Sequence, residues 1–245
     1  NSYHYEQIDL NENMDRLLAL IDAEKPQYIV NFASQSEVAP SWEKPGQWYQ
    51  TNTVALACLV NHLRKQSYLE RYLHISTCEV YGNCTGKVTE KTHMNPTTPY
   101  AASKAAADML LSVYNRQFSF PLVTVRSTNV YGARQQLYKI IPRSVIYQQL
   151  NKTIELHGGG VAEKSYIHIR DISRGELTIL KHGQVGQIYH LSPDKAVSIR
   201  SLVERICKLK GKSFDEVVHL VGERPGQDAA YQLDSSKAHT ELGWK

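Results

Sequence analysis

The first two thirds of the chain alternate short apolar segments with longer amphipathic ones. Residues 28–33, 71–76 and 122–126 are apolar runs of strand length, and residues 46–65 between them have the spacing of a helix. Strands as apolar as these are typical of a parallel sheet that helices cover on both faces. The pattern therefore predicts an α/β fold built on a parallel sheet.

Local signals predict further elements in this part of the chain. Residues 3–8 are expected to form a first strand, and Asn11 is expected to cap a helix that ends at Pro26. Pro99 stands at the first position of another helix, with Thr98 as its cap, which is the usual place for a proline in a helix.

Beyond about Gly132 the alternation loosens, and shorter strands and helices mix. This change predicts a first domain of residues 1–132 and a smaller lobe of residues 133–245, some of whose segments return to the first domain. The elements expected in the lobe are residues 139–149, 153–157, 161–169, 171–181, 187–191 and 198–210.

The composition is that of an ordinary water-soluble globule, with 42% hydrophobic and 21% charged residues. The net charge of +4 is interspersed and forms no basic stripe, which argues against nucleic-acid binding. No apolar run approaches the about 20 residues of a membrane span. The four cysteines have no zinc-like spacing, so we expect no metal site, reduced thiols and a cytoplasmic setting.

Tyr100 and Lys104 are four residues apart on the helix that begins at Pro99, so their side chains project from one face. A phenol has a pKa near 10 and is a poor base at neutral pH, but a neighbouring ammonium favours the phenolate. A tyrosine with a lowered pKa can take a proton from an alcohol while a hydride leaves the same carbon. This spacing alone is weak, because a Tyr packed on a Lys stem is common.

Further motifs give the pair its context. Residues 76–82 read Ser-Thr-Cys-Glu-Val-Tyr-Gly and residues 100–104 read Tyr-Ala-Ala-Ser-Lys. The other matching segments are residues 31–38, 51–52, 126–132, 224–228 and 241–244. Together they resemble, over essentially the whole chain, the nucleotide-sugar 4,6-dehydratases, a branch of the extended short-chain dehydrogenases. The resemblance implies a Rossmann-type doubly wound parallel sheet with a smaller mixed α/β lobe that binds the sugar nucleotide.

The glycines depart from the family pattern. The family opens with a strand, a Gly-rich turn and a helix that bind the dinucleotide pyrophosphate. Here the first glycine is Gly46, and the three glycines of residues 158–160 precede a predicted strand instead of a helix. We therefore expect that a piece of at least about 30 residues, the size of one βαβ unit, is missing before residue 1. The alternative is a protein that has lost dinucleotide binding.

The resemblance implies NAD as the cofactor and a nucleoside-diphosphate sugar as the substrate. The residues implied around NAD are Asp9, Leu10, Phe32, Ala33, Ser34, Thr51, Tyr100, Lys104 and Val130. Those implied around the substrate are Ser36, Thr77, Asn129, Lys139, Lys164, His190 and Arg224. Lys164 stands where the family usually has Arg, and His190 where it usually has Asn. Since lysine lacks the bidentate fork of arginine, the geometry of a phosphate contact at Lys164 differs from that of the family.

The implied reaction removes a hydride from C4 of the sugar to NAD+, a proton from C5 and the hydroxyl from C6, and returns the hydride to C6. Tyr100 would be the base for the C4 hydroxyl, Lys104 would tune it and hold the nicotinamide ribose, and Thr77 would hydrogen-bond the C4 oxygen. Glu79 would take the C5 proton, a task for which an epimerase has no need.

Cys78 is the main departure, because the family has Asp at this position. As a protonated acid, that Asp helps the C6 hydroxyl to leave. A thiol with a pKa of about 8.5 is mostly protonated at neutral pH and can donate in principle, although it is a weaker acid. Three interpretations stay open: Cys78 is the elimination acid, it is a neutral filler, or C6 elimination is not the reaction.

Together these features predict an NAD-dependent 4,6-dehydratase. A UDP-glucuronate decarboxylase or a 4-epimerase of the same superfamily is the alternative among enzymes, and a non-catalytic sugar-nucleotide-binding protein is the alternative of another class. Two helices, residues 46–65 and 99–118, resemble the pair that forms a four-helix dimer interface in the family. We therefore expect a homodimer.

Overall fold

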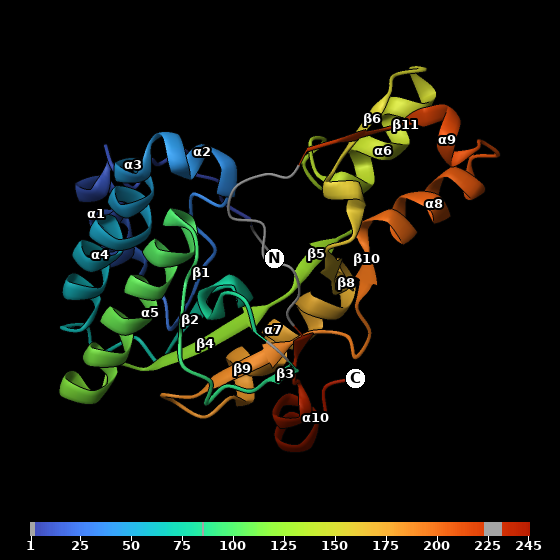
Figure 1. Cartoon of the computed structure of the whole chain (residues 1–245). Helices are drawn as coiled ribbons and strands as arrows, with labels where there is room; N and C mark the ends of the chain where they lie inside the picture. The colour runs from blue at the N-terminus through green and yellow to red at the C-terminus, as the bar shows by residue number, and fades with distance from the viewer. Residues whose placement is uncertain (1–2, 85, 223–231) are drawn as a thin grey trace. The chain divides into compact units, whose positions relative to one another are not determined.

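The computed structural model describes residues 3–84, 86–222 and 232–245 of the chain (Figure 1). It divides into two compact units. Unit 1 comprises Asn1–Val80, Pro96–Val125 and Thr178–Ile188, and unit 2 comprises Tyr81–Asn95, Arg126–Leu177 and Tyr189–Lys245. Residues 81–95, assigned to the first domain from the sequence, thus cluster with the second unit. No helix within the described ranges is both long enough and apolar enough to cross a membrane.

Unit 1 is built on a sheet of parallel strands, as the apolar runs predict. The strand order is β1 (Tyr28–Asn31), β2 (Arg71–Ile75), β4 (Leu122–Ser127) and β9 (Ile188–Leu191), and β2 pairs in parallel with both β1 and β4. β4 and β9 begin in unit 1 and continue into unit 2. The prediction of an α/β fold on a parallel sheet is confirmed.

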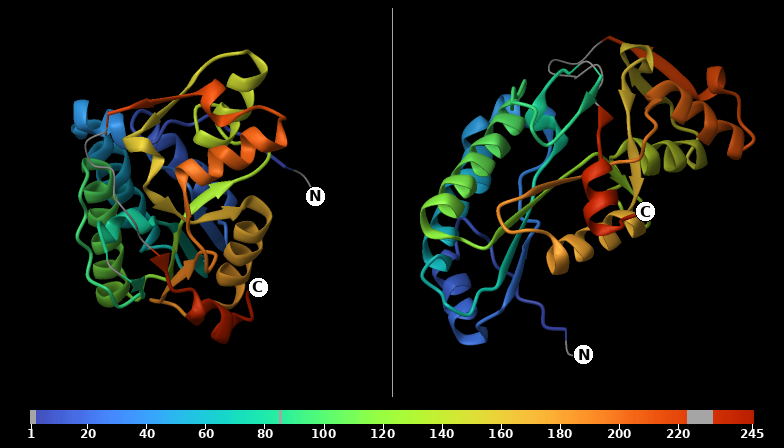
Figure 2. Two further views of the ribbon diagram at one scale, coloured as in Figure 1. Left: turned by 45° about the vertical axis from the view of Figure 1, so that its right-hand side comes forward. Right: turned by 90° about the horizontal axis from the view of Figure 1, so that it is seen from below.

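Three main helices cover one side of β1 and β2 in unit 1, as Figures 1 and 2 show. They are α1 (Met14–Glu24), α4 (Leu56–Leu63) and α5 (Pro99–Phe118). Their apolar side chains bury a core with Tyr72 of β2, whose ring centroid lies 5.3 Å from that of Phe120. This core fixes α5 against the sheet and thereby positions the residues at its N-terminal end.

Two predictions for the start of the chain were wrong in detail. Residues 3–8 form no strand, because no neighbouring strand hydrogen-bonds to them. The single helix expected over residues 46–65 is divided into α3 (Pro45–Tyr49), a π-helical turn η1 (Gln50–Ala55) and α4, and it is preceded by the short helix α2 (Val38–Glu43). A π-turn inserts an extra residue into a helix, which periodicity does not reveal.

Unit 2 is a mixed α/β lobe, as the sequence predicts. One part pairs β6 (Ile154–His157) in parallel with β11 (Val218–Val221) and covers them with helices around a small apolar core. The other pairs are β5 with β8, β7 with β10 and β3 with β12. The remaining elements are β3 (Lys87–Val88), β5 (Asn129–Tyr131), α6 (Ile140–Gln149), η3 (Gly158–Gly160), β7 (Glu163–Lys164), β8 (Tyr166–His168), α7 (Ile169–His182), β10 (Val197–Ser198), α8 (Ile199–Leu209), α9 (Phe214–Val217), β12 (Gln232–Leu233) and α10 (Ser236–Leu242).

Candidate active site

Three candidate catalytic residues follow the carboxyl end of β2. Thr77 leads into the 3₁₀ turn η2 (Cys78–Tyr81), and its hydroxyl oxygen accepts a hydrogen bond of 3.2 Å from the backbone N–H of Glu79. Thr77 and Cys78 are buried, and Glu79 is half-buried. The turn therefore presents a hydroxyl, a thiol and a carboxylate at the edge where ligands bind to parallel α/β sheets.

The other two candidates occupy the first turns of α5. The Thr98 side chain caps the helix by accepting a 3.1 Å hydrogen bond from the N–H of Ala101, and Pro99 takes the first position, as predicted. The N–H of Tyr100 donates to the hydroxyl of Ser41 at 3.2 Å. Tyr100 and Lys104 are both buried on one face of this helix. The cap and the Ser41 contact fix the helix start and, with it, the position of the phenol.

The phenol of Tyr100 lies against the η2 turn. Its pKa is raised, first by burial and then by the charge of Glu79, while a hydrogen bond with the Thr77 side chain opposes the rise. This direction corrects the expectation that Lys104 lowers the pKa of Tyr100, since the cost of burying a phenolate is the larger effect. The structure thus brings Tyr100 together with Thr77, Cys78 and Glu79.

Lys104 is held by the strand behind the site. Its Nζ donates a hydrogen bond of 2.8 Å to the backbone carbonyl of Ile75 in β2. Burial lowers the pKa of Lys104 to about 8, and the charge of Asp108 opposes this fall. A lysine with this pKa changes its charge close to physiological pH.

A buried asparagine ties α5 to the loop that follows β1. The side chain of Asn52, in the π-turn η1, accepts from the N–H of Gln35 at 2.8 Å and donates to the carbonyl of Gln35 at 3.0 Å. It also donates to the hydroxyl of Ser103 at 2.9 Å, and that hydroxyl donates to the carbonyl of Tyr100 at 2.7 Å. Asn52 belongs to one of the sequence motifs, but the motif did not predict this role.

Most of the residues implied around NAD lie at one edge of unit 1. Phe32, Ala33 and Ser34 directly follow β1, and the exposed fraction of Phe32 is 62%. The turn that contains Asp9 and Leu10 is joined to Thr51 by its next residue, Asn11, whose side chain donates a hydrogen bond of 3.0 Å to the Thr51 hydroxyl. Ser36 is exposed farther along the same loop. Val130 belongs to β5 in unit 2.

The implied substrate residues of unit 2 lie on several elements. The N–H of Asn129 donates to the carbonyl of Ser165 at 3.1 Å, which places it beside Lys164, the end residue of β7. Lys139 precedes α6, and its ammonium lies 5.2 Å from the centroid of the Tyr138 ring. Arg224 lies outside the described residues.

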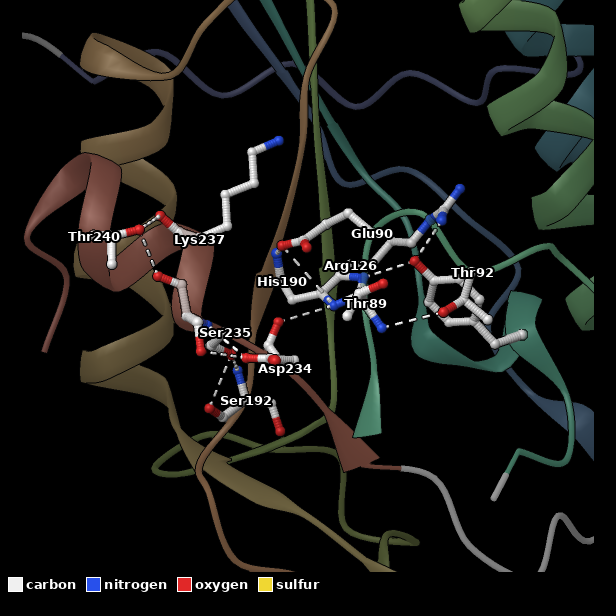
Figure 3. Close-up of polar contacts among 12 residues, drawn as sticks. Thr89, Glu90, Thr92, Arg126, His190, Ser192, Asp234, Ser235, Lys237 and Thr240 are labelled. Carbon is white, nitrogen blue, oxygen red and sulfur yellow. Dashed lines mark hydrogen bonds and ion pairs between the residues drawn. The ribbon is translucent and has the colours of Figure 1, made fainter. Parts of the chain in front are cut away.

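His190 is enclosed in unit 2 and does not line a surface. Figure 3 shows its polar contacts. Its Nε2 lies 2.6 Å from the hydroxyl of Tyr81, and its Nδ1 lies 3.2 Å from the carbonyl oxygen of Asp234. The guanidinium of Arg126 donates to the same Tyr81 hydroxyl at 2.6 Å, and Glu90 accepts from the backbone N–H of His190 at 3.1 Å. This placement favours a structural role for His190 over a substrate contact.

The donors and acceptors of this network fix the proton on His190. Arg126 can only donate, so the Tyr81 hydroxyl accepts from it and donates its own proton to Nε2 of His190. Nδ1 then carries the proton and donates to the carbonyl of Asp234. Burial and, after it, the charge of Arg126 lower the pKa of His190 to about 3, so the ring stays neutral.

The sequence analysis missed a second polar cluster, in unit 1. His74 and Ser76 of the β2 segment both contact the carboxylate of Asp108 on α5. The signal was present, because residues two apart on a strand share a face and Asp108 follows Lys104 by one helical turn. Among the described residues, no group of three or more His, Cys, Asp or Glu side chains is arranged to hold a metal ion.

A comparison with known protein families identifies the family of this chain. The model of the GDP-mannose 4,6 dehydratase family matches residues 1–245. The chain belongs to this family. The membership confirms the resemblance that the motifs around Thr77 and Tyr100 indicate.

A curated protein and a solved structure that resemble this chain support the same family. The human dTDP-D-glucose 4,6-dehydratase is 32% identical over 232 residues, which are 92% of this chain and 66% of that protein. DesIV, a dTDP-glucose 4,6-dehydratase from Streptomyces venezuelae solved with NAD and TYD bound, has a TM-score of 0.90 at 30% identity, over 97% of this chain and 73% of DesIV. These matches confirm the Rossmann-type fold.

The fold alone does not separate dehydratase from epimerase. A Bacillus cereus UDP-glucuronic acid 4-epimerase, solved with UDP-glucuronic acid and NAD, also has a TM-score of 0.90, at 26% identity, over 97% of this chain and 74% of the epimerase. The chain spans between 34% and 70% of the length of the first curated relatives that it matches. The reaction therefore has to be argued from the site residues.

Proposed function

We propose that this protein carries out the NAD-dependent dehydration of a nucleoside-diphosphate hexose to its 4-keto-6-deoxy product. The observation that carries the proposal is the cluster in unit 1 of buried Tyr100, Thr77 and Cys78 with half-buried Glu79. A 4-epimerase needs only the tyrosine and the hydroxyl. A carboxylate and a thiol beside the same phenol suit a reaction that also removes a proton and a hydroxyl from the sugar.

Tyr100 and Thr77 are proposed to act at C4. The hydrogen bond between their side chains identifies the place where the C4 oxygen would lie, within reach of both hydroxyls. Tyr100 takes the proton of the C4 hydroxyl. Lys104 supplies positive charge to this part of the site and is held in place by the carbonyl of Ile75.

Glu79 and Cys78 are proposed to act at C5 and C6. The C4 ketone acidifies the C5 proton, and the carboxylate of Glu79 accepts it. The C5–C6 double bond forms as the C–O bond at C6 breaks, and the hydroxyl leaves as water after it receives a proton from the Cys78 thiol. When the hydride adds to C6, Glu79 returns the proton to C5. Cys78 is 2% exposed, which suits a thiol that stays protonated until it donates.

The residues at the edge of unit 1 fit a dinucleotide. The exposed carboxylate of Asp9, the hydroxyls of Ser34 and Thr51 and the exposed ring of Phe32 combine hydrogen-bonding and apolar groups, as nucleotide sites do. We propose that they hold NAD, together with Leu10, Ala33, Tyr100, Lys104 and Val130. NAD supplies the acceptor for the hydride of C4 and the donor of the hydride to C6.

The proposed substrate contacts are Ser36, Thr77, Asn129, Lys139, Lys164 and Arg224. The two lysines suit the charge of a diphosphate but grip it as point charges, without the fork of arginine. His190 is left out because it is enclosed. We propose that unit 1 serves the cofactor and the hydride chemistry, and that unit 2 serves the nucleotide sugar.

A product assay tests the function. The purified protein, with NAD present, is incubated with a panel of UDP-, dTDP-, GDP- and CDP-hexoses and with UDP-glucuronate, and products are identified by mass spectrometry and NMR. A 4-keto-6-deoxy sugar from one hexose is the expected result. Release of carbon dioxide from UDP-glucuronate, a C4 epimer, or binding without turnover would each contradict it.

We further propose a homodimer formed by the helices of unit 1. Val54 and Cys58 are exposed one helical turn apart on η1 and α4, and Met109 and Val113 are exposed one turn apart on α5. Such apolar stripes on neighbouring helices suit a two-fold contact. Within the described residues the four cysteines form no disulfide with one another, which suits a reducing cytoplasm.

Sedimentation at micromolar concentration tests the dimer. A dimer that dissociates in Met109→Glu is the expected result, and the exposed residue Leu209 in unit 2 provides the control variant Leu209→Glu, which should stay dimeric. A monomeric parent would contradict the proposal.

A further inference from the structure

Three consecutive residues at the end of the β2 segment contact one face of α5. His74 and Ser76 are two residues apart, so their side chains emerge on the same face of the strand. Their partner is Asp108: Nε2 of His74 lies 3.3 Å from Oδ1, and the Ser76 hydroxyl donates to Oδ2 at 2.8 Å. The residue between them, Ile75, offers its carbonyl to Lys104.

Tyr100, Lys104 and Asp108 recur every four residues along α5, so the three side chains share one face. The side chain of Asp108 is 4% exposed and that of His74 is 1% exposed. A carboxylate so deeply buried is costly unless it is hydrogen-bonded and close to positive charge. The Ser76 hydroxyl provides the hydrogen bond, Lys104, one turn away, provides the positive charge, and His74 packs its ring nitrogen against the other carboxylate oxygen.

We propose that Asp108, held by His74 and Ser76, is a positioning residue that keeps the side chain of Lys104 cationic and oriented next to Tyr100. The proposal deepens the proposed function and rests on it for its link to catalysis. Asp108 does not reach the sugar in this scheme and acts only through Lys104.

The direction of the electrostatic effect agrees with this arrangement. Burial lowers the pKa of Lys104 to about 8, and Asp108 is the group that opposes the fall. Without Asp108, the ammonium would lose its proton at a lower pH, and the positive charge beside Tyr100 would be lost within the physiological range.

Other groups face the same stretch of α5 from the elements packed on it. Cys78 and Glu79 from η2 raise the pKa of Tyr100, as Asp108 itself does. The contacts from α2 and η1 are made by uncharged side chains, those of Ser41, Asn52 and Thr53. His74, from β2, contacts Asp108 and belongs to the proposed cluster.

The first test is a titration of Lys104 itself. The full chain is labelled at lysine Cε, the Lys104 signal is assigned by its loss in Lys104→Arg, and its midpoint is followed by NMR. Asp108→Asn should lower the midpoint by about one pH unit, as expected when an opposite charge at close range is removed. Asp108→Glu, which keeps the charge, should restore the midpoint. This measurement requires no activity.

The second test is kinetic. The rate of NAD+ reduction by the sugar is measured between about pH 6 and 10, where a lysine of lowered pKa titrates. In Asp108→Asn the alkaline limb of the pH–rate profile should move to lower pH by about one unit. At pH values above this limb the rate should therefore fall about tenfold. A residue with only a packing role would lower the rate equally at every pH.

A matched control is available on the surface. Asp22 on α1 also pairs with a histidine, with Oδ1 2.7 Å from Nε2 of His62, but both side chains are partly exposed. Asp22→Asn should change neither the Lys104 midpoint nor the alkaline limb. If Asp108→Asn does not fold, Ser76→Ala is the deciding variant, because it removes a hydrogen bond to the carboxylate and keeps the carboxylate itself. It should lower the Lys104 midpoint and the pH of the alkaline limb by smaller amounts.

The inference would be overturned if folded Asp108→Asn changed neither the Lys104 midpoint nor the alkaline limb of the pH–rate profile. Ser76→Ala takes its place if Asp108→Asn does not fold. Either result would leave the proposed function intact. If instead the parent oxidises no nucleotide hexose, the proposed function fails, and the NMR titration still decides whether Asp108 controls Lys104.

Discussion

Each unit of this protein buries a cluster of ionisable side chains, and the two clusters differ in what their protons can do. In unit 1, Lys104 has a pKa of about 8 and lies on the same helix face as Tyr100, so small changes of its surroundings alter its charge. In unit 2, His190 has a pKa of about 3, and its hydrogen bonds run in one direction from Arg126 through Tyr81. In the proposed function, equal burial thus serves chemistry in one unit and rigidity in the other.

The comparison teaches how to weigh a buried titratable residue. The His190 ring has a partner at each nitrogen, and the network includes backbone groups of β9 and of the residue after β12. The Tyr100 phenol instead lies among the side chains of three consecutive residues in one turn. Perturbed pKa values occur at both places, so the arrangement of neighbours is what separates them.

The strongest way to break the comparison is to remove the phenol of unit 1. Tyr100→Phe should slow the oxidation at C4 by about 10⁴-fold, because a general base contributes up to this amount, while substrate binding is kept. The measurement is the absorbance of NADH formed with the sugar. The control is Tyr114→Phe on the same helix, whose ring packs on the core. A Tyr100→Phe protein that reduces NAD+ at the parent rate would refute the role of Tyr100.

A second change in unit 1 separates oxidation from elimination. Cys78→Ala should leave the oxidation at C4 intact and slow the dehydration by about 10²-fold or more, so that NADH and a 4-keto hexose accumulate. Rapid-quench analysis of the products measures both steps. Cys78→Asp should restore turnover if the carboxyl stays protonated, and Cys207→Ala, in the core of unit 2, is the control. Normal dehydration by Cys78→Ala would make the thiol a filler.

In unit 2 the corresponding change should affect stability instead of chemistry. Tyr81→Phe leaves both Arg126 and His190 without their shared hydroxyl and should lower the free energy of unfolding by about 2 to 4 kcal/mol. Urea denaturation measures this loss. Tyr189→Phe removes a part-buried hydrogen bond to Glu241 and should cost only about 1 kcal/mol. Equal losses of unfolding free energy in the two variants would show that the network around Tyr81 contributes no more to stability than the single hydrogen bond of Tyr189.

The effect that is smallest at neutral pH concerns acid. The pKa of His190 is lower in the folded chain, at about 3, than the ordinary value of 6.5, so the unfolded chain binds the extra proton between these limits. The stabilisation is therefore complete above pH 6.5 and declines as the pH falls from there to about 3, by at most about 1.4 kcal/mol per pH unit. His190→Asn should flatten this decline in urea denaturation curves, and surface variant His62→Asn should not. An equally steep decline in His190→Asn would show that other groups cause it.

The sequence predicted much of this arrangement, for identifiable reasons. The strands of unit 1 are apolar and its helices periodic, so the parallel sheet and the start of α5 at Pro99 follow from local pattern. The gathering of Thr77, Cys78 and Glu79 around Tyr100 was anticipated from motifs. Their roles stay predictions, since they rest on the resemblance.

What was missed depends on contacts between distant segments. The π-turn around Asn52 is stabilised by contacts with Gln35 and Ser103, which lie 17 and 51 residues away in the chain. The pKa direction of Tyr100 was mistaken because burial and the negative charge of Glu79, which the spacing of Tyr100 and Lys104 does not reveal, both raise this pKa. His190 was assigned to the substrate by the family resemblance, whereas its partners come from three other parts of unit 2.

The interleaving of the two units has a consequence for how the protein is made. Unit 1 draws on three stretches of chain, the last of which is Thr178–Ile188. A ribosome must therefore synthesise all of Arg126–Leu177, a stretch of unit 2, before it synthesises the last stretch of unit 1. Domains usually fold in the order in which they emerge. Here the η2 turn and helix α5 leave the ribosome early but wait for a late segment to complete their unit. During this period chaperones would have access to the apolar surface.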